Sequence, residues 1–69
     1  MRTLRQINAV YEYIIHSDLS DRIKALKLSK LMMEMERGYG IPMIRDRDWE
    51  KENKAVVAMY RKISRSRNL

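Results

Sequence analysis

The 69-residue sequence has no cysteine, a single histidine (His16), two glycines and one proline. Without cysteine the chain forms no disulfide, and it can build neither a zinc finger nor a thiol nucleophile. It also lacks the roughly 20 consecutive apolar residues of a membrane span, and residues 1–6 lack the apolar stretch of a signal peptide. We therefore expect a cytoplasmic protein without a membrane span, a metal or another cofactor.

The composition is that of a small folded domain. Hydrophobic residues make up 45% of the chain and charged residues 35%, which is typical of a soluble folded chain rather than a disordered one. A chain this short buries only about 60% of the surface that its unfolded form exposes. Stability then has to come from helix packing, self-association or a partner. We predict one all-α domain over residues 1–69, with a homo-oligomer as an alternative to a monomer.

Residues 3–16 have the pattern of an amphipathic helix. Thr3 is a suitable N-cap. Apolar residues recur at helical spacing on one side: Leu4, Ile7, Val10, Tyr11, Ile14 and Ile15. Residues 16–20 are rich in side chains that form turns and helix caps, so Asp18 or Ser20 is expected to begin the next helix.

Residues 19–37 carry two apolar stripes on one helix. The first stripe consists of Leu19, Ile23, Leu26 and Met33. The second consists of Ala25, Leu28, Leu31, Met32 and Met35. A helix with two stripes is expected to be buried on two sides, which makes this the central helix of a three-helix domain, paired with the first helix as a hairpin. Gly38 is expected to end it in the left-handed conformation.

Residues 38–47 are predicted to form an apolar loop, which is long for a compact domain. In one interpretation, Tyr39, Ile41 and Ile44 close the end of the core. In the other, the loop and the methionines of the preceding helix form an adaptable binding surface, because Met side chains repack around different shapes. The second interpretation assigns five residues to partner binding: Met32, Met35, Tyr39, Ile41 and Met43.

Residues 48–65 are predicted to form a third, basic amphipathic helix that begins near Asp46 or Asp48. Its apolar stripe consists of Trp49, Val56, Tyr60 and Ile63. Its basic face consists of Lys51, Lys54, Arg61, Lys62 and Arg65. Asn53 is a second candidate N-cap and would divide the segment. Residues 51–69 hold six basic residues and one acidic residue, and therefore account for five of the six net positive charges.

Arrangements of residues typical of catalysis are scarce. His16 is at the polar end of a helix, and no Ser or Cys nucleophile accompanies it in a recognisable motif. Carboxylates at positions 46, 48, 50 and 52 alternate as in a calcium loop, but the turn glycine and the closing glutamate are missing. The two glycines do not form a phosphate-binding loop. We therefore expect no enzymatic activity.

Two functions fit this pattern, and no segment carries a motif that identifies a family. The first is a small regulatory or inhibitory protein that binds another protein through the Met-rich apolar surface and the basic helix. The alternative is a nucleic-acid-binding protein that contacts phosphates with the basic face of the third helix. Recognition of specific bases fits less well, because acidic residues begin that helix and a long loop precedes it.

Overall fold

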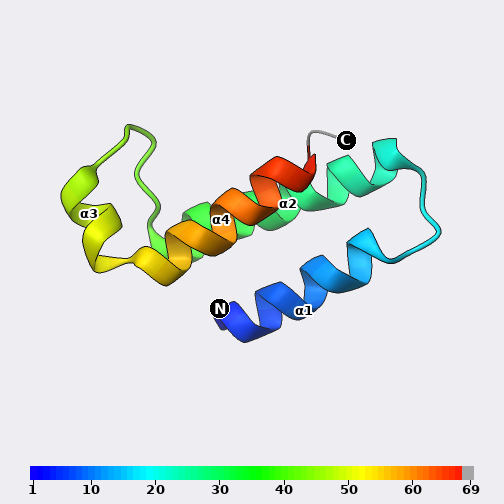
Figure 1. The fold of residues 1–69 in the computed structure, drawn as a ribbon, viewed down its shortest axis with the longest axis horizontal. Coiled ribbons are helices and arrows are strands. Elements are labelled where there is room, and N and C mark those ends of the chain that lie inside the picture. The colour runs from blue at the N-terminus through cyan, green and yellow to red at the C-terminus, as the bar shows by residue number, and fades with distance from the viewer. Residues whose placement is uncertain (68–69) are drawn as a thin grey trace.

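The computed structural model describes residues 1–67. It contains four helices, α1 (Leu4–Ile15), α2 (Asp21–Tyr39), α3 (Arg47–Glu52) and α4 (Lys54–Arg67) (Figure 1). Helices are the only regular secondary structure in this part of the chain, which confirms the all-α fold class. Asn68 and Leu69, the end of the expected domain, lie outside the described residues.

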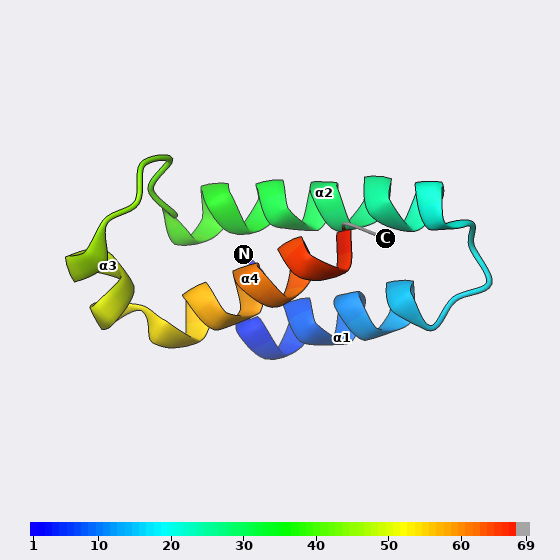
Figure 2. The ribbon, with the colours of Figure 1, turned by 45° about the horizontal axis from the view of Figure 1, so that its top comes forward.

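Helices α1, α2 and α4 pack against one another, and α2 runs antiparallel to the other two (Figure 2). The short helix α3 packs against α4 at one end of the molecule. The described chain is elongated, with extents of 38 × 21 × 16 Å. Each of the three long helices contacts the other two, so the central position expected for the second helix does not distinguish α2 from α1 and α4.

The first two helices begin at side chains that satisfy backbone N–H groups. The Thr3 hydroxyl accepts from the Gln6 N–H at 3.1 Å, and the Gln6 side chain accepts from the Thr3 N–H at 2.9 Å. This reciprocal pair is a capping box. Of the two candidates for the second helix, Ser20 is the cap, since its hydroxyl accepts from the Ile23 N–H at 3.3 Å.

Helix α2 ends two residues later than expected, because Gly40 and not Gly38 adopts the left-handed conformation, with φ of 64°. Gly38 continues the helix, and its lack of a side chain makes room for Met1, whose Sδ lies 2.6 Å from an ideal Cβ at that position. Tyr39 extends the helix because its ring packs against the core. Its hydroxyl also donates to the Arg2 carbonyl at 2.8 Å.

The prediction of one continuous third helix was wrong, and the alternative with a break at Asn53 is confirmed. The Asn53 side-chain amide donates to the Trp49 carbonyl at 2.9 Å at the end of α3. Its own carbonyl accepts from the Val57 N–H at 3.0 Å in the first turn of α4. Asn53 thus satisfies backbone groups of both helices.

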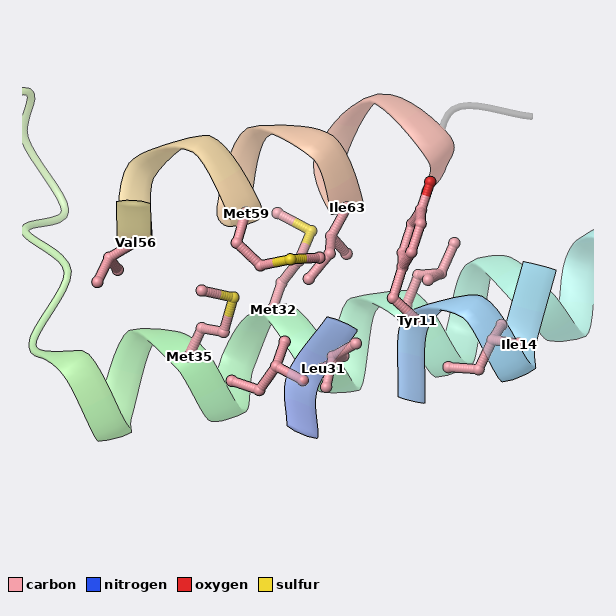
Figure 3. Packing of buried hydrophobic residues seen from close by; sticks show 10 residues of the cluster. Tyr11, Ile14, Leu31, Met32, Met35, Val56, Met59 and Ile63 are labelled. Carbon is pink, nitrogen blue, oxygen red and sulfur yellow. The ribbon is translucent and has the colours of Figure 1, made fainter. Parts of the chain in front are cut away.

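A single hydrophobic core lies between α1, α2 and α4 (Figure 3). It consists of Ile7, Tyr11, Ile14, Leu28, Leu31, Met32, Met35, Val56, Met59 and Ile63. Only the second of the two α2 stripes contributes to it. Ile23, Leu26 and Met33 of the first stripe are 42%, 57% and 50% exposed, so the expected burial of α2 on two sides was wrong. The reason is that α1 and α4 also contact each other, which places both on the same side of α2.

Within residues 1–67, no helix combines the length and the apolar character needed to cross a membrane.

Candidate functional site

The connection between α2 and α3 is an exposed loop, residues 41–46, at one end of the molecule (Figure 1). Gly40 ends α2, and Pro42 lacks the backbone N–H that a continuing helix would use. Asp46 then caps α3 by accepting the backbone N–H three residues later at 3.1 Å. Two large apolar side chains of this loop are almost fully exposed: Met43 and Ile44.

A groove of about 300 Å³ adjoins the loop. Its walls come from the loop, from α3 and from α4, and include Ile41, Met43, Ile44, Trp49, Tyr60 and Arg61. Apolar side chains from three consecutive segments therefore meet in one hollow. Such a concave, largely apolar surface with a few polar groups is typical of a binding site.

Glu50 links the three segments that form this groove. Its carboxylate accepts from the Arg61 guanidinium of α4 at 3.0 Å and lies 3.5 Å from the guanidinium of Arg45 in the loop. The Glu50 side chain is 23% exposed, whereas both arginines are more open to solvent. One carboxylate thus links the loop, α3 and α4, and partly neutralises the two arginines.

Tyr60 of α4 has a displaced pKa. Partial burial of the ring and a hydrogen bond from its hydroxyl to the Glu36 carboxylate raise the pKa of Tyr60 to about 12. The phenol therefore stays neutral and holds α4 to the C-terminal half of α2 beside the groove.

The structure separates the five residues that were predicted to bind a partner through an apolar surface. Met32 and Met35 are 6% and 0% exposed and belong to the core, so their placement on a binding surface was wrong. The physical reason is that α1 and α4 cover the stripe of α2 that contains them. Tyr39 and Ile41 are half-buried against the core, and only Met43 is fully open.

The alternative interpretation, in which the loop closes the end of the core, is right in part. Tyr39 and Ile41 pack against the core as it requires. Ile44 does not, because its side chain is 83% exposed.

The five residues of the predicted basic face do not form one surface. Arg61 faces α3 through its pairing with Glu50. Lys62 faces α1, where its Nζ lies 3.0 Å from the Asn8 side-chain oxygen and 4.9 Å from the centre of the Tyr11 ring. All five residues are exposed to solvent, and the other three are Lys51, Lys54 and Arg65.

A second, shallower hollow gathers basic residues where α3 meets α4. It is lined by Arg45, Arg47, Lys51, Lys54 and Arg61, with Glu50 as the acidic member. Lys51 and Lys54 thus lie beside the apolar loop, whereas Lys62 and Arg65 of the predicted basic face do not line this hollow.

Residues suited to acid–base or metal chemistry do not gather in the described chain. His16 is exposed, and its Nε2 lies 3.1 Å from the Glu12 carboxylate in the same helix. No group of three or more His, Asp or Glu residues within residues 1–67 is arranged to hold a metal ion.

The sequence did not predict that Ile44, Trp49 and Tyr60 line one groove. Trp49 and Tyr60 were assigned to the apolar stripe of one helix, and both are half-buried. The break at Asn53 is the signal that separates them, because it allows α3 to turn toward the loop.

No protein-family model matches this chain, and neither a curated protein nor a solved structure is similar to it.

Proposed function

We propose that this chain is a regulatory or inhibitory protein that binds another protein through the loop surface, which we define as Met43, Ile44 and the adjacent groove. The single observation that carries the proposal is the exposure of Met43 and Ile44 at the rim of an apolar hollow. Burying a side chain of this size contributes about 1.5–3 kcal/mol. Two such residues next to a groove are suited to serve as anchors for a partner.

Charge around the loop surface indicates the character of the partner. Arg45 of the loop lines the shallow hollow together with Arg47, Lys51 and Lys54, and Glu50 compensates only part of their charge. A partner with an apolar anchor and acidic residues around it would fit, since charges at the rim mainly speed association and set orientation. The proposed protein acts by binding and not as an enzyme. The proposal includes the cytoplasmic location that is expected from the cysteine-free composition.

Affinity capture from an extract of the native source, treated with nuclease, tests the proposal. Three baits are compared: wild type, the loop variant with Met43→Ser and Ile44→Ser, and the control Tyr13→Ser. Tyr13 is a similarly exposed apolar residue on α1, away from the loop. We expect at least one protein that wild type and the control retain and that the loop variant binds about tenfold less or worse. Equal retention by the loop variant and the control would contradict the proposal.

The convergence of basic residues in the shallow hollow favours nucleic acid as a second candidate partner. Titration of labelled duplex DNA and single-stranded RNA against salt tests this candidate. If phosphates are bound, replacing Lys51 and Lys54 with Gln should lower the slope of log K against log salt by about 0.7–0.9 per lost contact. Binding that is unaffected by these changes, or is lost with the loop variant instead, would argue against it.

A further inference from the structure

The side of α2 that faces away from the core carries apolar residues that no other helix of residues 1–67 covers. We call Ile23, Leu26 and Met33 the outer stripe. They are exposed by 42% to 57%, although the opposite side of the same helix contains fully buried Leu28 and Met35. Scattered apolar residues are normal on a protein surface, but these three lie along one side of one helix, interrupted only by Lys30.

The outer stripe has the spacing of a coiled-coil seam. With Leu19 before the helix and the basic residues Lys30 and Arg37, its positions are separated by alternating steps of four and three residues. This alternation keeps one side of a helix against a partner helix. We propose that the outer stripe binds the same stripe of a second copy of this chain, with the two α2 helices antiparallel.

Charge within the seam selects the antiparallel orientation. A parallel pair would place Lys30 against the partner's Lys30 and Arg37 against the partner's Arg37. In the antiparallel pair centred on residue 28, Ile23 instead lies opposite the partner's Met33, and Lys30 lies beside the partner's Leu26. A lysine can cover an apolar neighbour with its methylene stem while its ammonium group stays in water.

Charge along the edges of the seam agrees with the same register. Arg22 lies opposite the partner's Glu36 on one edge, and two-fold symmetry repeats this pair. The Glu36 carboxylate also accepts from the Tyr60 hydroxyl of its own chain, so the arginine would be its second donor. In a parallel pair, Arg22 would instead face the partner's Lys27. On the other edge of the antiparallel pair, Lys27 faces the partner's Lys27. The seam therefore has two attractive charge pairs and one repulsive pair.

Met1 enlarges the apolar area at the end of the seam. Its side chain lies against Gly38, and it lines a shallow hollow together with Met33, Lys30 and Arg37. The partner's Ile23 would enter beside Met33 and meet this hollow.

Sedimentation equilibrium of the full chain from about 10 μM to about 1 mM tests the proposal. We expect a reversible dimer, and we expect Leu26→Gln to raise its Kd at least about tenfold. Leu26 is exposed, so this variant should keep the wild-type helix content in circular dichroism. Met43→Gln is the control, since it alters a still more exposed apolar residue away from α2 and should leave the Kd of the dimer unchanged.

A charge exchange tests the orientation. Arg22→Glu should weaken the dimer about threefold or more, and Arg22→Glu combined with Glu36→Arg should restore the wild-type Kd. Arg65→Glu on α4 makes the same change of net charge away from the seam and should have no such effect. A monomer at about 1 mM, an unchanged Kd in Leu26→Gln, or a folded double variant that fails to restore dimerisation would overturn the proposal. Binding of an unrelated protein to the stripe of a monomeric chain would overturn it as well.

Discussion

The hydroxyl of Tyr60 joins two helices through one hydrogen bond to the Glu36 carboxylate. Burial of the ring and the neighbouring carboxylate raise the pKa of Tyr60 from 10.0 to about 12. Between these pH values the folded chain keeps a proton that the unfolded chain has lost, so the free energy of unfolding falls as pH rises. This contribution is complete below about pH 10 and is lost as pH rises through 12.

Alkaline titration of the tyrosines by ultraviolet absorbance checks this behaviour. The chain has four tyrosines, and wild type should show a component that ionises near pH 12. Tyr60→Phe should remove this component and flatten the decline in stability above pH 10 relative to wild type. Tyr13→Phe serves as the control. A titration in which Tyr60→Phe and Tyr13→Phe lose the same component would show that Tyr60 has no special environment.

Leu28 and Ile23 differ in their contribution to stability although they belong to the same helix. Leu28 is fully buried, so Leu28→Ala should lower the free energy of unfolding by about 2–5 kcal/mol, a large share of the total for so small a domain. Ile23 is exposed, and Ile23→Ala should change it by no more than about 0.5 kcal/mol in the monomer. Urea unfolding at low protein concentration measures both. If both variants lost a comparable free energy of unfolding, α2 would have to be buried on two sides.

At the scale of helices, the sequence predicts where a helix lies better than the residue at which it ends. Helical periodicity and the capping residues Thr3 and Ser20 locate the first two helices well, because these signals are local. The choice between Gly38 and Gly40 as the end of α2 is not local. It depends on Tyr39 reaching the core and on Met1 lying against Gly38, two contacts between segments far apart in sequence.

If α2 ends at Gly40, alanine at Gly38 and alanine at Gly40 should change the free energy of unfolding in opposite directions. Gly40 has φ of 64°, where a side chain costs about 1–2 kcal/mol, so Gly40→Ala should destabilise the fold by about that amount. Gly38 lies inside the helix, and alanine there gains up to about 1 kcal/mol of helix propensity. The flexible end of Met1 has to move aside, which offsets part of the gain. Chemical unfolding of both variants tests this, and a larger loss in Gly38→Ala would place the end of the helix at Gly38.

The division of α2 into a buried side and an exposed side could not be predicted from its sequence. Both stripes have apolar residues at suitable spacing, and nothing in the pattern says that α1 and α4 pack on the same side. The predicted binding residues Met32 and Met35 were misplaced for this reason. Met43 follows Pro42, outside any helical pattern, and is exposed as a surface residue has to be. Its part in partner binding stays a prediction.

At the scale of the whole molecule, the chain has more large apolar side chains than its core uses. The core holds ten residues between three helices. The large apolar side chains that stay exposed lie mainly at two places, the loop surface and the outer stripe. The loop lies at one end of the molecule, and α2 runs along its length (Figures 1 and 2). We infer that the two places have different occupants, a protein partner for the loop surface and a second copy for the outer stripe.

The six methionines report on this division in one measurement. Hydrogen peroxide oxidises an exposed methionine to its sulfoxide, and peptide mass spectrometry gives the rate at each position. At low protein concentration, we expect fast oxidation at Met1, Met33 and Met43 and slow oxidation at Met32, Met35 and Met59. Raising the concentration should protect Met33 and leave Met43 reactive. Equal rates at all six positions, or protection of Met33 and Met43 together at every concentration, would contradict the account.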